Sequence, residues 1–163
     1  MSLIRQFKGT DAHPAIQFVK YAIGGGLATA AYIIMFHLVA WKLFPALQPA
    51  DWGVRLCHLQ VAAISDTQRS HNAMIANVPA FLVSNLVAYL VNILWVFKRG
   101  RHHILIEFGL FTLVSGVSMA IGTPMMGYLI SHYGMQTTYA FIANLVTALC
   151  INYAMRKYVI FKG

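Results

Sequence analysis

A long uncharged stretch near the middle of the chain constrains the fold more than any other feature. The segment from Val78 to Phe97 carries no charged residue over 20 residues. A helix formed by it would be about 30 Å long and would cross the apolar core of a bilayer. The segment ends at Trp95 and Phe97, and Lys98 follows at once. An apolar run followed by aromatic residues and then cations is typical of the cytoplasmic end of a transmembrane helix, so we expect this segment to span a membrane.

The composition of the chain agrees with a membrane location. Hydrophobic residues make up 59% of the chain and charged residues only 10%, whereas soluble domains carry about 25% charged residues. The net charge of +8 is compatible with nucleic-acid binding, but the cations cluster at the ends of apolar runs. That placement favours membrane topology over a DNA-binding face. Cys57 and Cys150 suggest neither a disulfide framework nor a metal motif, and the N-terminal residues lack the pattern of a cleaved signal peptide.

Four apolar segments of suitable length follow one another along the chain. We predict transmembrane helices over about residues 16–44, 75–97, 106–132 and 139–161. The short connection over residues 133–138 should make the last two helices an antiparallel pair. Pro124 removes a backbone donor from the third helix, so a kink is expected there. The chain is thus predicted to be one all-α membrane domain over residues 1–163.

The connection between the first two helices, residues 45–74, is predicted to be an outer loop. Within it Val54, Cys57, Val61 and Ile64 recur at near-helical spacing beside polar residues. This pattern predicts a short amphipathic helix that lies on the membrane surface.

The distribution of cations predicts the orientation of the helices. Nine of the 12 Lys and Arg residues lie in the N-terminal head, in the loop after the second helix and at the C-terminal end, counting those at helix ends. The two opposite loops contain Lys42, Arg55 and Arg69. The positive-inside rule therefore predicts that both termini are cytoplasmic.

Short matches between the two halves of the chain suggest an internal duplication. A shift of 90 residues places Gly26 on Gly116 and Ala30 on Ala120. A shift of 67 residues places residues 75–77 on residues 142–144, and both triplets read Ile-Ala-Asn. Both copies would begin on the cytoplasmic side, so we expect two parallel copies of a helical hairpin rather than an inverted repeat.

The order of these motifs resembles that of the GtrA-like family of small four-helix membrane proteins. Residues 18–21, Phe-Val-Lys-Tyr, precede a glycine run as in the first helix of that family. Asn77, Asn92 and the Trp-Val-Phe of residues 95–97 resemble its second helix, and Asn152 and Arg156 resemble its fourth. The resemblance covers nearly the whole chain from about Ile16 onward.

This resemblance implies a function in the synthesis of cell-surface polysaccharides. Members of the family are implicated in moving a polyprenyl-phosphate-linked sugar across the bacterial inner membrane, often beside a glycosyltransferase. A chain of four helices would need a second copy or a partner to complete the path. The expected function is therefore that of a lipid-linked sugar flippase, and the alternative is a scaffold that anchors a glycosyltransferase without transporting anything.

Asparagines within the apolar segments are the first candidates for contact with the sugar. An unpaired amide in hydrocarbon costs several kcal/mol, so these side chains should face partner helices or a polar cavity. They are Asn85, Asn92, Asn144 and Asn152. Hydrogen bonds between helices, worth about 0.6 kcal/mol each, explain the same residues without a substrate. Asn77 lies just before Pro79, which favours a helix cap at that position.

Two cations at the cytoplasmic end of the helices are candidates for binding the lipid phosphate. Arg156 follows Asn152 by one helical turn, and a guanidinium can bind a phosphate with two hydrogen bonds. Lys20 occupies a similar place at the start of the first helix. Both are also explained as anchors that extend to the membrane interface.

Other function classes receive less support from the sequence. No arrangement for nucleophilic catalysis, metal binding or a cofactor can be named, so an enzyme is not expected. An exporter of cationic drugs would need an acidic residue inside a helix to exchange for a proton. None of the four predicted helix cores contains one.

Overall fold

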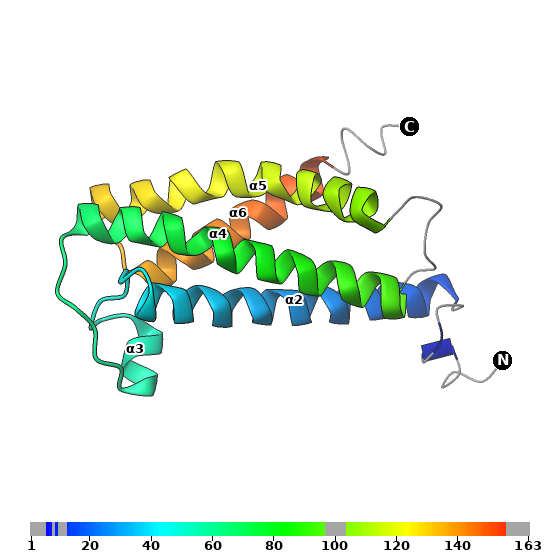
Figure 1. Ribbon diagram of the computed structural model, residues 1–163, viewed down its shortest axis with the longest axis horizontal. Coiled ribbons are helices and arrows are strands. Elements are labelled where there is room, and N and C mark those ends of the chain that lie inside the picture. Colours follow the sequence, from blue (N-terminus) through cyan, green and yellow to red (C-terminus); the bar gives the residue numbers. More distant parts are fainter. Residues whose placement is uncertain (1–5, 8, 10–12, 97–103, 156–163) are drawn as a thin grey trace.

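The computed structural model describes residues 6, 7, 9, 13–96 and 104–155, and every regular element in these ranges is a helix. The elements are α2 (Pro14–Lys42), α3 (Trp52–Cys57), α4 (Asp66–Val91), the π-helix η1 (Asn92–Val96), α5 (Ile104–Tyr133) and α6 (Thr137–Met155). Helix α4 packs against both α2 and α5, and α6 packs mainly against α5. Figure 1 shows α6 crossing the other long helices obliquely.

The long helices form two antiparallel pairs, α2 with α4 and α5 with α6 (Figure 1). One end of the bundle carries α3, the end of α2 and the start of α4, and we call it the α3 end. The start of α2 and the described end of α6 both lie at the opposite end, which we call the Lys20 end. The predicted antiparallel arrangement of the last two helices is confirmed. Their bounds agree with the prediction except at the end of α6, because residues 156–161 lie outside the described ranges.

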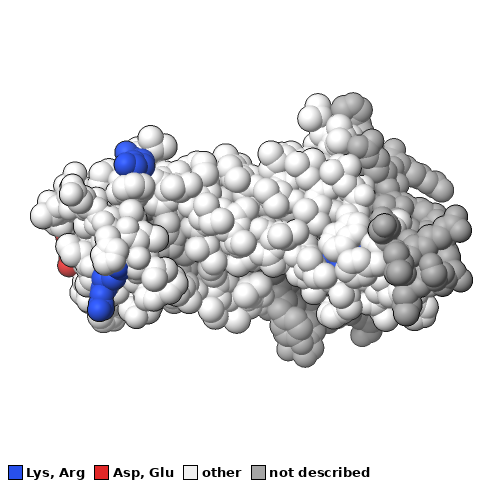
Figure 2. All heavy atoms as spheres, turned by 90° about the horizontal axis from the view of Figure 1, so that it is seen from below, with Lys and Arg blue, Asp and Glu red and all other residues white. Residues whose placement is uncertain are grey.

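Three helices are long and apolar enough to span a bilayer: Ala15–Lys42, Asp66–Val96 and Ile104–Tyr133. Helix α6 is apolar but shorter within the described residues, so a fourth span stays a prediction. Large apolar side chains point outward along the bundle, among them Leu27, Leu113 and Leu149, which are more than half exposed. In Figure 2 the middle of the visible surface is almost free of charge, and the prominent charged side chains lie near the α3 end. The chain is therefore a multi-pass membrane protein.

The predicted loop over residues 45–74 is too long, because α4 begins at Asp66 and not at Ile75. Ser65 caps this helix, and its hydroxyl accepts a hydrogen bond from the Gln68 backbone N–H at 3.3 Å. A Ser followed three residues later by Gln is the sequence pattern of a capping box, a signal that apolar periodicity does not contain.

A helix forms within this loop as predicted, but it is shorter than expected, and its position on the membrane surface stays a prediction. Helix α3 covers Trp52–Cys57, so Val61 and Ile64 lie outside it. The helix ends because His58 takes the left-handed conformation with φ of 50°, which stops an α-helix of L-residues.

Two buried charged residues, Asp51 of this loop and Arg69 of α4, fasten these elements to the start of α6 and the residues before it. The Asp51 carboxylate accepts hydrogen bonds from the backbone N–H groups of Gln48, at 2.8 Å, and Thr138, at 2.7 Å. The Arg69 guanidinium donates to the Met135 carbonyl at 3.0 Å and forms an ion pair with Asp66 at 2.8 Å. Acceptance of an N–H at a helix start also places the Asp51 charge favourably in the helix dipole.

The apolar core occupies the half of the bundle nearer the α3 end. Phe36 stacks on Phe141 with ring centroids 4.0 Å apart, and Met126 and Ile130 of α5 are fully buried beside them. Alanines 73, 76 and 80 of α4 let the helices approach closely in this region. The half nearer the Lys20 end contains a cavity with polar groups set in a largely apolar wall, which we call the polar cavity.

Candidate functional site

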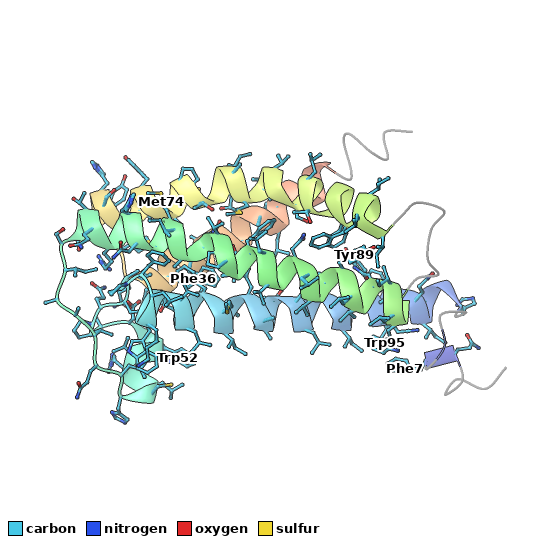
Figure 3. All side chains as sticks on the ribbon, in the orientation of Figure 1. Phe7, Phe36, Trp52, Met74, Tyr89 and Trp95 are labelled. Carbon is cyan, nitrogen blue, oxygen red and sulfur yellow. The ribbon has the colours of Figure 1, made fainter. Side chains whose placement is uncertain are left out.

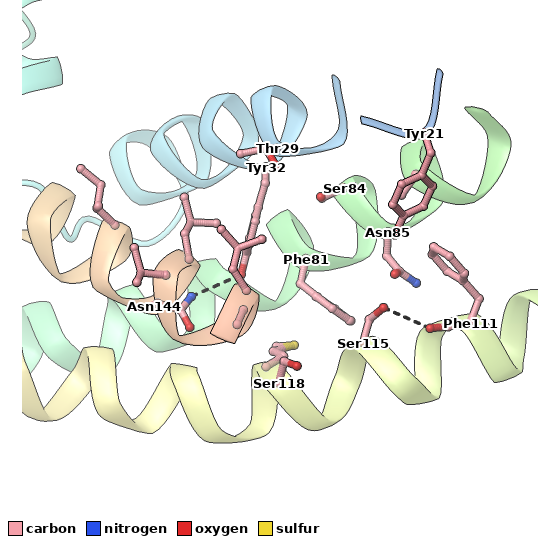
Figure 4. A pocket seen from close by; sticks show the side chains of 17 residues that line it. Tyr21, Thr29, Tyr32, Phe81, Ser84, Asn85, Phe111, Ser115, Ser118 and Asn144 are labelled. Carbon is pink, nitrogen blue, oxygen red and sulfur yellow. Dashed lines mark hydrogen bonds between the residues drawn. The ribbon is translucent and has the colours of Figure 1, made fainter. Parts of the chain in front are cut away.

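An open cavity of about 420 Å³ lies between the four long helices (Figure 4). Each helix contributes polar groups to its wall: Tyr21, Thr29, Tyr32, Ser84, Asn85, Ser115, Ser118 and Asn144. Phe81, Phe111 and Met119 supply apolar parts of the same wall. A volume of this size is within the range of small-molecule sites, about 300–1,000 Å³.

The cavity opens to the outside of the bundle along the seam between α2 and α6. Those of its lining residues that are exposed, Thr29, Ile142, Val146 and Leu149, come from these two helices. The lining residues of α4 and α5 are buried or half-buried. Because α6 contacts α2 only sparsely, this seam is the open side of the cavity.

A cluster of hydrogen-bonded side chains closes the cavity toward the apolar core. The Tyr32 hydroxyl donates to Asn77 Oδ1 at 2.6 Å, and Asn77 Nδ2 donates to Thr123 Oγ1 at 2.7 Å. Asn144 Nδ2 lies 3.4 Å from both the Tyr32 hydroxyl and Asn77 Oδ1. The cap predicted at Asn77 is therefore wrong, since this residue lies inside α4 and joins α2 to α5.

Among the described residues, the remaining oxygen of Asn144 has no hydrogen-bond partner. Asn144 is 3% exposed, and its Oδ1 is buried against Gly122 of α5. The 90-residue shift equates Gly122 with Tyr32, which satisfies Asn77 in the other half of the chain. A buried acceptor without a partner costs about 1–3 kcal/mol, so such a group calls for a functional or structural explanation.

Asn85 lies on the wall of the cavity and also joins two helices. Its Nδ2 donates to Thr112 Oγ1 at 2.6 Å, and the residue is 5% exposed. Ser84 beside it donates to the Ala28 carbonyl at 2.9 Å. The structure therefore places two of the predicted site residues, Asn85 and Asn144, in the lining of one cavity, and both make contacts between helices.

Lys20 is buried at the Lys20 end of the bundle and does not line the cavity. Its ammonium group donates to the Gly9 carbonyl at 2.7 Å and lies 5.2 Å from the centre of the Trp95 ring. The Trp95 indole N–H in turn donates to the Phe7 carbonyl at 2.8 Å, and the two rings meet edge to face (Figure 3). In this conformation the Gly9 carbonyl occupies the ammonium group of the predicted phosphate anchor.

The other predicted site residues are not placed at the cavity. Asn92 is half-buried in the first position of η1 and is absent from the cavity wall. Asn152 belongs to α6, but its side chain is outside the described set, as is the whole of Arg156. Their predicted contacts with sugar or phosphate stay predictions.

Several cavity residues were overlooked in the sequence. Tyr32 was one aromatic residue among many, while Ser115 and Ser118 are common small residues in transmembrane helices. Their spacing of three residues, one helical turn apart within an apolar run, was the available signal that one face of α5 meets a polar space.

Comparison with known proteins places the chain among membrane proteins of one family. The model of the GtrA/DPMS transmembrane domain matches residues 20–161. The uncharacterized membrane protein YwcD of Bacillus subtilis (strain 168) is 32% identical over 90 residues, which are 53% of this chain and 71% of that protein. No solved structure matches the chain. Because the match covers nearly all the described helices, this chain belongs to the GtrA/DPMS transmembrane-domain family.

Proposed function

We propose that this protein moves a polyprenyl-phosphate-linked sugar across the bacterial inner membrane. Membership of the GtrA/DPMS family suggests a role in glycan synthesis. The observation that supports the finer proposal is the polar cavity, which faces lipid between α2 and α6. The proposal includes membrane spanning by all four long helices, cytoplasmic termini and no catalytic step.

The cavity would lower the cost of moving a sugar through hydrocarbon. Transfer of an unpaired hydroxyl or amide from water to a fully apolar medium costs about 4–8 kcal/mol of free energy. A sugar carries several hydroxyls. Asn85, Asn144 and the serines of α5 offer donors and acceptors along the wall. The unpartnered Asn144 Oδ1 is an acceptor that a sugar hydroxyl would satisfy after a rotation of the side chain.

The seam between α2 and α6 gives the lipid tail a separate route. While the head group lies in the cavity, the polyprenyl chain can extend out through the exposed side at Thr29 and Val146. The polyprenyl chain therefore stays in the bilayer. Passage through such a groove needs no energy source when a reaction on the far side removes the product. We also propose that a second copy of the chain or a glycosyltransferase completes the path.

The lipid phosphate would bind at the Lys20 end. Lys20 supplies one cation there once the Gly9 carbonyl is displaced from its ammonium group, and Arg156 would supply the second. Charge-assisted hydrogen bonds from an ammonium and a guanidinium are the interactions that hold phosphate groups most strongly in proteins.

The first test is leaflet exchange of a fluorescent polyprenyl-phosphate sugar in liposomes. Ala88 is half-buried on the cavity wall, so Ala88→Phe should fill the cavity and slow exchange about tenfold or more, which corresponds to about 1.4 kcal/mol in the barrier. The control is Ala120→Phe, because Ala120 is exposed on α5 and does not line the cavity. Its exchange should equal that of the wild type.

Two outcomes of this test would count against transport. Equal slowing by both variants would show that the added ring acts through folding and not through the cavity. Wild-type protein that is folded but exchanges the lipid no faster than empty liposomes would favour the scaffold, whose mark is copurification with a glycosyltransferase.

A further inference from the structure

A second hollow lies at the α3 end and differs in character from the polar cavity. It has a volume of about 470 Å³ and lies between α2, α3 and the start of α6. Its lining is almost entirely apolar and aromatic: Ile34, Leu38, Trp41, Trp52, Leu56 and Phe141 are among the residues that form it. We call it the α3 groove. Apolar walls of this kind suit a hydrocarbon chain.

The α3 groove continues the seam on which the polar cavity faces the membrane. Both hollows lie between α2 and α6, and Ile142 lines both. They are separated where α6 crosses α2, at the stacked rings of Phe36 and Phe141 and the hydrogen bond between Tyr32 and Asn144. A single lipid moving along this seam would meet the polar cavity first and the apolar groove second.

Two cations without acidic partners lie near the groove. Lys42 is exposed, and its ammonium group lies 3.6 Å from the centre of the Trp41 ring, which lines the groove. Arg55 is exposed on α3, next to the lining residue Leu56. Within the described residues the ion pair found is that of Arg69 with Asp66, so both cations are available to an anionic head group.

Hydrogen bonds before and after α3 fix the position of this helix. The buried Asp51 carboxylate ties the residue before α3 to the start of α6 at Thr138. After α3, the Trp41 indole N–H donates to the Gln60 carbonyl at 3.0 Å. These bonds hold both sides of the helix and keep the groove between α3 and α2 open.

We propose that the α3 groove binds the polyprenyl chain of the lipid-linked sugar after its head group has crossed, with Lys42 and Arg55 beside the phosphate. This inference rests on the proposed transport function and assigns its second lipid site. The polyprenyl chain lies among the apolar residues of α2 and α3 and points toward the middle of the bilayer, while the phosphate stays at the membrane surface. An ammonium and a guanidinium complement the charge of that phosphate.

The test uses the two free cysteines of the chain. Cys57 lines the groove, whereas Cys150 is exposed on α6 and lines neither hollow. Undecaprenyl phosphate is added to the full-length protein in detergent micelles, and alkylation of each thiol by a maleimide is followed by mass spectrometry. At a lipid concentration about ten times the dissociation constant, some 90% occupancy should slow alkylation of Cys57 about tenfold. Cys150 is the internal reference and should react at an unchanged rate.

A variant that fills the groove provides the matched comparison. A Cβ at Gly53 would meet the His37 ring at 3.5 Å, an ordinary contact, so a leucine there fits the backbone and occupies the groove. Gly53→Leu should remove the protection of Cys57 by the lipid, while Ala62→Leu at an exposed loop position should retain it.

The outcomes separate the groove from the transport function. Wild-type protein that exchanges the lipid between leaflets but shows no protection of Cys57 would contradict lipid binding in the α3 groove and leave the proposed transport function unaffected. Protection of Cys57 without exchange would support the groove and contradict transport. Equal protection by phosphatidylglycerol would show a general lipid site and overturn the assignment to the polyprenyl lipid.

Discussion

Gly122→Ala is expected to destabilise the protein by about 1–3 kcal/mol, the usual cost of overpacking a tight contact. A Cβ at Gly122 would lie 2.1 Å from Asn144 Oδ1 and 3.2 Å from its Cγ. The Asn144 side chain must therefore turn away and lose its contacts with Tyr32 and Asn77. The free energy of unfolding in mixed detergent micelles measures this effect.

Another glycine of α5 provides the control for this substitution. A Cβ at Gly116 would meet nothing within 4 Å, so Gly116→Ala should be neutral or stabilise the helix by up to about 1 kcal/mol. A double-mutant cycle then tests the mechanism: in an Asn144→Ala background, Gly122→Ala should cost far less. An unchanged cost in that background would show that Asn144 is not the group displaced.

Asp51→Ala is expected to cost about 3 kcal/mol or more, since hydrogen bonds to charged groups contribute about 1.5–3 kcal/mol each. The substitution leaves the backbone N–H groups of Gln48 and Thr138 without their acceptor at a buried site. It also releases α3 from the start of α6. Unfolding in mixed micelles measures the loss in stability, and faster alkylation of Cys57 reports the loosened α3.

The matched control for Asp51 is another helix cap. Ser65→Ala removes the exposed cap of α4, whose hydroxyl accepts from Gln68 at 3.3 Å, and should cost only about 0.5–1 kcal/mol. If the two substitutions cost the same, the buried carboxylate does not fasten the loop in the way that the structure indicates.

The long helices of this fold could be predicted because the signal for each of them lies in one continuous stretch of the sequence. Apolar runs of bilayer length, such as the one over residues 104–133, show the long helices without any knowledge of their neighbours. The start of α4 was misplaced because residues 66–72 are polar, and a search for apolar runs excludes them. Ser65 and Gln68 still carry the local signal of a helix start.

The site was harder to predict because it depends on which helix faces meet. Asn77 was interpreted as a cap from its neighbour Pro79, but its partners, Tyr32 and Thr123, are 45 and 46 residues away in the chain. Asp51 was assigned to a surface loop, and only the position of α6 shows that it is buried. Asn85 and Asn144 were found because an amide within an apolar helix is costly wherever the helix packs.

The central claim is that the sugar passes through the polar cavity, and photo-crosslinking tests it most directly. A polyprenyl-phosphate sugar with a diazirine on the sugar ring is added to the protein in liposomes, irradiated and mapped by mass spectrometry. If the sugar passes through this cavity, labels should fall on cavity residues such as Ser115 and Asn144, and Ala88→Phe should carry fewer labels. Labels confined to lipid-facing residues such as Leu113 and Val117, with none in the cavity, would contradict it.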